Sequence, residues 1–384
     1  MSYELFSTTQ RVAFAQGAVN NLVSEIKRLG ASKPCIITDP GLMSTGLVEK
    51  VQNILKDGGL ESCLYGKVQA DPPYELVDQT VELVKSEGAD CVIGIGGGSS
   101  LDMAKVTSVM VKNPGSVSDY FGIDLIKNKG LPLILIPTTA GTGSEVTPIV
   151  ILSDEGEKLK KGVVSPYLYP DCALLDPELT IGLPPAVTTA TGMDALIHAV
   201  EAYTSKNATP MSDILAKEAM QLIFGNLRSA YADGTNAEAR GNMLRGSMLA
   251  GMAFANAGVT AVHAFAYPIG AEFHIPHGIA NTIMLVPVMR FNMLGNLERF
   301  ADLAEIFGQP TEGLSTRQAA LKAVDSLAEL AEDLKVPQHL KDYGVKEANV
   351  PELAEGVLKV TRLLANNPRK LELADAEAIY RAAL

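Results

Sequence analysis

The chain has 384 residues, of which 47% are hydrophobic and 20% are charged, and its formal net charge is −12 at pH 7. This length exceeds what a single hydrophobic core usually supports, so two domains are expected, and the composition is that of an ordinary globular protein. The acidic balance argues against nucleic acid and anionic membrane surfaces as partners, because both bind clusters of Lys and Arg.

The sequence shows neither a membrane span nor a secretion signal. No apolar run approaches the length of a span, and the first residues lack a basic region followed by an apolar core. The four cysteines, Cys35, Cys63, Cys91 and Cys172, are widely spaced, and three of them lie in apolar strand-like runs. This pattern is typical of buried thiols in a cytoplasmic protein, and it favours neither a disulfide framework nor a CxxC metal site.

The first half of the chain alternates short apolar runs with amphipathic helical stretches. Near-continuous apolar strands separated by helices predict a parallel sheet covered by helices on both faces. We therefore assign residues 1–182 to an α/β domain. Its strands are expected at residues 34–39, 91–95 and 131–136, and its helices at 46–56 and 101–112.

The second half has a different pattern, with long helical stretches rich in Ala, Leu and Met. The change follows the proline-containing segment 176–185, which places the domain boundary near residues 182–185. We expect residues 183–384 to form an all-α domain.

A glycine-rich turn follows the strand expected at 91–95 and opens the next helix. It reads Gly94-Ile95-Gly96-Gly97-Gly98-Ser99-Ser100. Bare backbone N–H groups and the positive end of a helix could hold a pyrophosphate there without a lysine. A tight strand-to-helix turn also needs glycine, but three consecutive glycines favour the phosphate interpretation. Ser99 replaces the last glycine of the usual GxGxxG motif, which indicates a variant of the dinucleotide fold.

Two further polar positions belong to the same expected domain. Asp39 ends a strand and could bond a ribose 2′-hydroxyl and repel a 2′-phosphate, although the usual acid follows the glycines. A helix N-cap or an Asx turn at residues 39–41 accounts for Asp39 equally well. A second polar turn at 137–145 follows the strand at 131–136, and its small hydroxyl residues could line a nucleotide or serve only as a turn.

Residues 191–281 hold four of the five histidines of the chain. Residues 190–201 are expected to form a helix, on which Asp194 and His198 lie one turn apart on the same face. Farther on, His263 and the pair His274 and His277 lie in largely apolar surroundings.

One carboxylate with up to three imidazoles suits a divalent transition metal such as Fe(II), Zn(II), Mn(II) or Co(II). Taken singly, His263 and His277 are more simply buried histidines, and Asp194 is more simply a local cap or pair. A fold that brings all four residues together would favour a metal site, because such convergence by chance is rare.

These motifs resemble the iron-containing (group III) alcohol dehydrogenase family over nearly the whole chain. The resemblance implies the fold shared with dehydroquinate synthase, with an N-terminal α/β dinucleotide-binding domain, a Rossmann-like variant, and an all-α C-terminal domain. Many members dimerise through an N-terminal strand, which residues 3–9 could supply, so a homodimer or higher homo-oligomer is expected. The segments that carry the resemblance are 96–99, 137–142, 176–177, 191–201, 276–278 and 365–369.

The resemblance also implies the residues that bind the metal and the cofactor. Fe(II) is the implied ion, with Zn(II) as an alternative, and its ligands would be Asp194, His198, His263 and His277. Asp39 falls where the family selects NAD, Asp71 near the adenosine half, and Lys160 where a lysine approaches the nicotinamide ribose. The full set expected to bind NAD is Asp39, Asp71, Gly97, Gly98, Ser99, Asp102, Thr138, Thr139, Thr142, Lys160 and Leu179.

The implied activity is the NAD(H)-linked interconversion of a small primary alcohol or diol and its aldehyde. The cation would polarise the substrate oxygen as a Lewis acid, while the nicotinamide takes or gives a hydride. The expected pocket walls, Ile149, Phe254, Val259 and Tyr267, suit a short aliphatic substrate. The alternatives are the reduction of an anionic short aldehyde, a dehydroquinate-synthase-like or glycerol-dehydrogenase-like enzyme of the same fold, and a non-enzymatic binding protein.

The chain departs from its family at Tyr267, where similar members carry a second histidine four residues after the His263 equivalent. That histidine is usually given a role in passing the alcohol proton to solvent. A phenol is a poorer proton acceptor at neutral pH, so we expect Tyr267 to act as a wall whose hydroxyl can relay a proton. His274 could serve as the proton acceptor, line the cleft or be structural.

Overall fold

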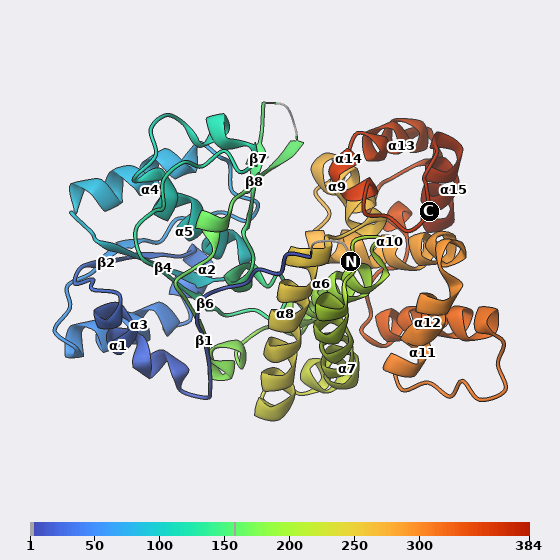
Figure 1. Ribbon diagram of the computed structural model, residues 1–384, viewed down its shortest axis with the longest axis horizontal. Coiled ribbons are helices and arrows are strands. Elements are labelled where there is room, and N and C mark those ends of the chain that lie inside the picture. Colours follow the sequence, from blue (N-terminus) through green and yellow to red (C-terminus); the bar gives the residue numbers. More distant parts are fainter. Residues whose placement is uncertain (1–3, 157–158) are drawn as a thin grey trace. The chain divides into compact units, whose positions relative to one another are not determined.

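The computed structural model describes residues 4–156 and 159–384 and divides into two compact units (Figure 1). One unit comprises Thr8–Gly182, and the other combines residues 4–7 with Leu183–Leu384.

The N-terminal residues join the second unit through Asn256. The Ser7 N–H donates to Asn256 Oδ1 at 2.8 Å, and Asn256 Nδ2 donates to Ser7 O at 2.9 Å. The sequence pattern places these residues in the first domain. The contact with Asn256 could not be predicted, because a side chain that binds an extended backbone leaves no periodic pattern in the sequence. Residues 4–9 of the expected dimerisation segment form no strand, and Tyr3 lies outside the described residues.

The first unit is built on a six-stranded sheet in the order β1-β9-β6-β4-β2-β3. Every neighbouring pair in this sheet is parallel. The prediction of a parallel sheet is therefore confirmed, and its central strands are buried along their whole length, as near-continuous apolar runs require. The strands are β1 (Val12–Phe14), β2 (Pro34–Ile37), β3 (Cys63–Tyr65), β4 (Cys91–Gly96), β6 (Leu133–Pro137) and β9 (Cys172–Leu175).

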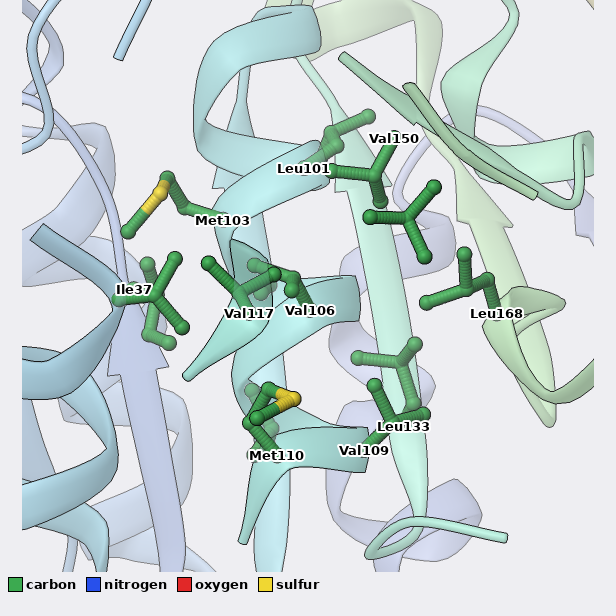
Figure 2. Packing of buried hydrophobic residues seen from close by; sticks show 14 of the residues in the cluster. Ile37, Leu101, Met103, Val106, Val109, Met110, Val117, Leu133, Val150 and Leu168 are labelled. Atoms are coloured by element: carbon green, nitrogen blue, oxygen red, sulfur yellow. The ribbon is translucent and has the colours of Figure 1, made fainter. Parts of the chain in front are cut away.

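Helices cover both faces of this sheet. Successive side chains of a strand point to opposite faces, so they pack against different helices. Cys35 and Ile37 of β2 lie in one hydrophobic cluster with residues of α4 and α5, part of which Figure 2 shows. Ile36 lies in a second cluster with residues of α1 and α3. These helices are α1 (Leu22–Arg28), α3 (Leu47–Asp57), α4 (Leu76–Ser86) and α5 (Gly98–Met110).

A smaller sheet of three strands, in the order β5-β8-β7, belongs to the same unit. It joins β5 (Gly122–Ile123), β7 (Ile149–Asp154) and β8 (Leu159–Val164), with β7 and β8 antiparallel. The sequence did not predict this sheet. The polar start of β8, Lys160-Lys161-Gly162, hides the strand because it carries neither apolar alternation nor β-branched residues.

The second unit is helical, and no strand occurs among its described residues. Its central helix α6 is buried over most of its length, which fits a helix that is apolar on all sides. Gly192 of α6 allows close packing, because a Cβ atom there would lie 2.4 Å from Leu227 Cδ1 of α7. The helices are α6 (Pro185–Thr204), α7 (Pro210–Ala232), α8 (Ala237–Ala257), α9 (Ala261–Phe273), α10 (His277–Asn292), α11 (Leu297–Ile306), α12 (Thr316–Asp333), α13 (Val350–Leu358), α14 (Thr361–Leu364) and α15 (Leu373–Ala383).

Within the described residues, no single helix has both the length and the apolar composition of a membrane span. Helices α8 and α9 have the required length and apolar composition only when they are taken together, and they meet at an angle of 102°.

Candidate metal centre and cofactor site

Three of the predicted metal ligands come together in the second unit. Asp194 of α6, His263 of α9 and His277 of α10 offer ligand atoms that all lie within 4.8 Å of one another. Asp194 Oδ1 is 3.7 Å from His263 Nε2 and 3.8 Å from His277 Nε2. Helices distant in the sequence therefore place one carboxylate and two imidazoles at a common point.

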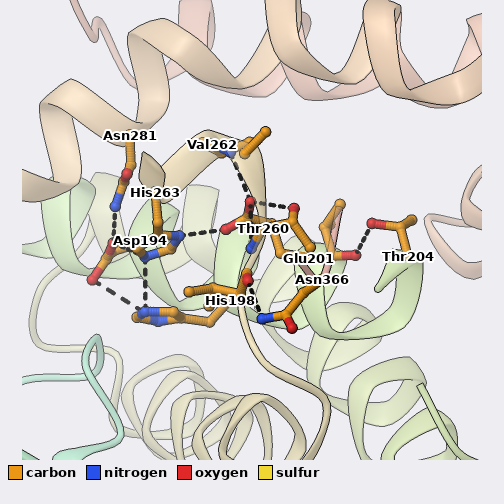
Figure 3. Close-up of polar contacts among 12 residues, drawn as sticks. Asp194, His198, Glu201, Thr204, Thr260, Val262, His263, Asn281 and Asn366 are labelled. Atoms are coloured by element: carbon orange, nitrogen blue, oxygen red, sulfur yellow. Dashed lines mark hydrogen bonds and ion pairs between the residues drawn. The ribbon is translucent and has the colours of Figure 1, made fainter. Parts of the chain in front are cut away.

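His198 lies beside this group, one helical turn after Asp194 (Figure 3). Its Nε2 is 3.0 Å from His263 Nε2, and its Nδ1 is 3.9 Å from Asp194 Oδ2. The ring of Phe254 stacks on the His198 ring at a centroid distance of 4.3 Å. The side chain of His198 is thus held against the other candidate ligands by packing on one face.

Glu201 was not predicted as a functional residue, yet it fixes the orientation of His263. It is fully buried, and its carboxylate accepts a hydrogen bond from His263 Nδ1. It also accepts from the Thr260 N–H at 3.1 Å, the Thr260 hydroxyl at 2.5 Å and the Val262 N–H at 2.8 Å. Because Nδ1 carries the proton that Glu201 accepts, the Nε2 lone pair of His263 is directed to the site.

Asn281 was also missed, and it supports the other side of the group. Its Nδ2 donates to Asp194 Oδ1 at 2.7 Å and lies 3.1 Å from His277 Nε2. Its Oδ1 is buried and has no hydrogen-bond partner. A buried orphan oxygen next to a carboxylate and imidazoles marks a place where a further polar group is accommodated.

The electrostatics of the group favour a cation. Burial raises the pKa of Asp194, but His198, His277, His263 and the Asn281 amide outweigh burial and hold the pKa below its usual value. Burial lowers the pKa of His263, and the neighbouring Glu201 reverses this effect and raises it. Among the described residues, no ion pair joins Asp194 or Glu201 to a Lys or Arg. A divalent cation would balance the two buried carboxylates, so the residues fit such an ion.

Tyr267, His274 and Val259 were also predicted for the substrate side, and each has a different environment. The ring of Tyr267 lies 6.2 Å from that of His277, and burial raises the pKa of its phenol, which therefore stays protonated at neutral pH. His274 is exposed and ends α9 in a left-handed conformation, with φ of 54°. Val259 is nearly buried, and its carbonyl accepts a hydrogen bond from Asn366.

In the first unit, the two predicted polar turns lie side by side, because β4 and β6 are neighbours in the sheet. The Thr138 N–H donates to Gly96 O at 3.0 Å. A Cβ atom on Gly98 would lie 2.6 Å from Thr142 Cγ2, so only glycine allows this approach. A Cβ atom on Gly97 would face Thr139 at 3.6 Å.

Asp71, Ser99 and Lys160 form a second predicted group that the fold brings together. Lys160 Nζ is 2.6 Å from Asp71 Oδ1, and the Asp71 N–H donates to Ser99 Oγ at 3.3 Å. Asp71 has a positive φ of 49°, which is rare outside glycine. The Ser153 hydroxyl donates a hydrogen bond to the Asp71 carbonyl and supports this backbone conformation.

Asp39 caps a short helix and also contacts the start of α5. Its Oδ1 accepts from the Leu42 N–H at 2.9 Å and caps α2 (Pro40–Met43). Its Oδ2 accepts from the Ser100 hydroxyl at 3.1 Å, at the start of α5, which places the carboxylate next to the glycine turn.

Two further residues of the predicted NAD-binding set, Leu179 and Asp102, make contacts within the first unit. Leu179 is 2% exposed and belongs to a hydrophobic core cluster. Both oxygens of Asp102 accept hydrogen bonds from the protein, from the Ser144 hydroxyl at 2.6 Å and the Ile151 N–H at 2.9 Å.

Comparisons with known proteins agree across both units. Residues 9–177 match the family described as iron-containing alcohol dehydrogenase, and residues 188–384 match the C-terminal part of the Fe-containing alcohol dehydrogenase family.

Two relatives and one solved structure illustrate the range of similar proteins. Long-chain-alcohol dehydrogenase 1 of Geobacillus thermodenitrificans is 45% identical over 96% of this chain and 93% of its own length. Sulfoacetaldehyde reductase of Bilophila wadsworthia is 42% identical over 94% of each chain. A crystal structure of 1,3-propanediol oxidoreductase covers 100% of both chains with a TM-score of 0.97 and 39% identity. These matches show that the chain belongs to the iron-containing alcohol dehydrogenase family, as its motifs predicted.

Proposed function

We propose that this enzyme uses NAD(H) and one divalent metal ion, iron(II) by family, to interconvert a short aliphatic primary alcohol or diol and its aldehyde. The observation that carries the proposal is the grouping of Asp194, His263 and His277, with His198 beside them. The dinucleotide would bind at the two polar turns of the first unit.

The metal ion, when bound, supplies Lewis acidity that polarises the substrate oxygen. The protein prepares the ligands for it. Glu201 keeps the proton of His263 on Nδ1, and Asn281 holds Asp194 by a hydrogen bond to Oδ1. Phe254 packs on the ring of His198 and Tyr267 lies beside His277, so each aromatic ring covers part of the ligand group.

The cofactor residues have separate roles in this proposal. The bare N–H groups of the glycine turn and the N-terminus of α5 would hold the pyrophosphate. Asp71 would lie near the adenosine half of the cofactor, and Lys160, which pairs with it, near the nicotinamide ribose. The residues that we propose for NAD are Asp39, Asp71, Gly97, Gly98, Ser99, Asp102, Thr138, Thr139, Thr142, Lys160 and Leu179.

A panel of alcohols and aldehydes, assayed with NAD(H) and NADP(H) on protein of defined metal content, tests this function. We expect NADH to accumulate steadily with a short primary alcohol. Turnover without any accumulation of NADH would point to a dehydroquinate-synthase-like cyclase, which returns the hydride within one turnover.

Reduction of an anionic short aldehyde is the second candidate, because a relative that is 42% identical to this chain is a sulfoacetaldehyde reductase. The panel should therefore pair propanal with an aldehyde of similar length that carries a sulfonate. A higher kcat/KM for the sulfonate would favour this class of substrate.

The Asp39→Gly variant is expected to lose most of the preference for NAD over NADP. Asp39 presents its carboxylate next to the glycine turn, where it would repel a 2′-phosphate. The ratio of kcat/KM for the two cofactors measures this effect. Equal values of kcat/KM for NAD and NADP in the unmodified protein would contradict the assignment of Asp39.

The Tyr267→Phe variant is expected to lower turnover only modestly, and Tyr267→His to retain activity. Because its phenol stays protonated, Tyr267 can pass a proton as a hydroxyl but does not act as the principal base at neutral pH. We expect alcohol oxidation to be fastest at alkaline pH in all three proteins. If Tyr267→Phe abolished turnover while metal and NAD still bound, the phenol would have to be the principal acid and base.

We further propose that the protein acts in the cytoplasm as a homodimer or higher homo-oligomer. All four cysteines are free thiols, which is typical of a reducing compartment. Light scattering coupled to gel filtration would measure the oligomeric state.

A further inference from the structure

Helix α9, which carries His263 and Tyr267, lacks the usual cap at its start. Thr260 precedes its first turn, and the Thr260 side chain makes no capping hydrogen bond. The Thr260 hydroxyl donates to Glu201 instead, at 2.5 Å. The first N–H groups of a helix have no partner within that helix. Because the start of α9 is buried, these groups need acceptors from elsewhere in the protein.

Two buried side chains from distant parts of the chain provide these acceptors. Glu201 of α6 accepts from the Val262 N–H at 2.8 Å. Asn367, which lies between α14 and α15, accepts through its Oδ1 from the Ala261 N–H at 3.3 Å. Ala261 is the first residue of α9, and His263 follows two residues later. Glu201 and Asn367 together therefore replace the missing cap next to a metal ligand.

The amide of Asn367 also joins the start of α9 to α10. Asn292 is the last residue of α10, and its Nδ2 donates to Asn367 Oδ1 at 2.8 Å. In return, Asn367 Nδ2 donates to Asn292 Oδ1 at 2.8 Å and also to Arg369 O at 2.6 Å. With the bond from Ala261, these contacts use both acceptor and both donor positions of an amide that is 1% exposed. Any other orientation of the amide would break buried hydrogen bonds, so its orientation is fixed.

The preceding residue, Asn366, holds the turn that leads into α9. Its Nδ2 donates to Val259 O at 2.9 Å (Figure 3). Gly258 packs against the same side chain, because a Cβ atom there would lie 2.3 Å from Asn366 Nδ2. Gly258 also has a φ of 78°, which favours glycine. Residues 366 and 367 thus bind the connection between α8 and α9 from Gly258 to Ala261.

We propose that Asn367 is a positioning residue for the metal ligand His263, which it holds in place through the start of α9. This inference rests on the proposed function, because it concerns the proposed metal site. Asn367 acts through the backbone and not as a ligand, since its amide already has four partners. Without it, the buried Ala261 N–H would lose its acceptor, and the first turn of α9 would shift together with the imidazole of His263.

The test compares Asn367→Ala with Asn113→Ala in the full chain. Asn113 is a matched control, since it is 4% exposed and its amide also makes four hydrogen bonds of 3.2 Å or less. It lies in the first unit, whereas the candidate metal ligands lie in the second. Both variants lose a fully bonded buried amide, but only Asn367→Ala releases the start of α9.

Competition with a chelator gives the dissociation constant for Zn(II) of each metal-free protein, and thermal unfolding is measured on the same samples. We expect Asn367→Ala to weaken Zn(II) binding about tenfold, which is the lower end of the effect of changes just outside a ligand set. Asn113→Ala should lower the unfolding temperature by a similar amount and leave the dissociation constant unchanged. Asn366→Ala should weaken Zn(II) binding to a smaller extent, and it provides the test if Asn367→Ala folds poorly.

Two results would overturn the inference. One is an unchanged dissociation constant for Zn(II) in the folded Asn367→Ala and Asn366→Ala proteins. The other is an equal loss of Zn(II) affinity in Asn113→Ala, which would make the effect one of general destabilisation. Failure of the proposed function gives a different result, because the unmodified protein would then bind neither Zn(II) nor Fe(II), and the inference would fail with it.

Discussion

The His263→Ala variant is expected to lose its bound metal and nearly all alcohol oxidation. The change removes one ligand and also leaves the buried carboxylate of Glu201 without the donor at Nδ1. The loss of metal affinity should exceed the about 10- to 100-fold that changes outside the ligand set usually cause. Elemental analysis gives the metal content per chain, and NADH formation gives the activity.

His339→Ala is the matched control, because His339 is the one histidine outside residues 191–281 and is exposed. It should bind metal and turn over as the unmodified protein does. Full metal content and full activity in His263→Ala would remove His263 from the site.

The Glu201→Gln variant is expected to weaken metal binding by about 10- to 100-fold while the fold is kept. The glutamine oxygen can still accept from the N–H groups of Thr260 and Val262 at the start of α9. Its amide nitrogen would then donate to His263 Nδ1, which forces the ring proton onto Nε2 and blocks the lone pair that a metal needs. Competition with a chelator measures the affinity, and thermal unfolding measures the fold.

Two further variants separate this effect from others at Glu201. Glu201→Ala removes the acceptor for the first turn of α9 as well, so it should lower the unfolding temperature more than Glu201→Gln does. Glu218→Gln, at an exposed position of α7, should change neither metal affinity nor stability. Wild-type metal affinity in Glu201→Gln would show that the orientation of His263 does not depend on Glu201.

The sequence predicted the parts of the site that rest on short-range spacing. Asp194 and His198 are four residues apart on one helix, and the glycine turn follows an apolar strand, so local periodicity places both. The association of α6, α9 and α10 depends on tertiary packing, and only the resemblance to a family could bring His263 and His277 to Asp194.

The supporting residues were missed although a signal was present. Glu201 lies seven residues after Asp194, two turns along the same helix face, in a stretch that is otherwise almost wholly apolar. Asn281 lies four residues after His277, and so one turn along α10. Each of these polar residues lies at helical spacing from a ligand, on a helix face that is expected to be buried. A buried polar group requires a hydrogen-bond partner, and the ligand is the nearest one.

Other features could not be read from the sequence for physical reasons. Asp102 follows the glycine turn, but the direction of its carboxylate depends on contacts with Ser144 and with Ile151 of β7, which tertiary packing sets. Leu179 follows a proline in a short 3-10 helix whose buried side is set by the packing around it. The attachment of residues 4–7 to the second unit depends on the single side chain of Asn256.

Removal and return of the metal tests the dependence of this enzyme on both metal and NAD most directly. The protein is stripped with a chelator, Fe(II) is added back without oxygen, and NADH formation from a short primary alcohol is followed together with the metal content. NADH formation should stop on removal and return in proportion to bound metal, with full activity at one ion per chain. Unchanged NADH formation in the metal-free protein, or none in the loaded protein with any alcohol of the panel, would contradict this dependence.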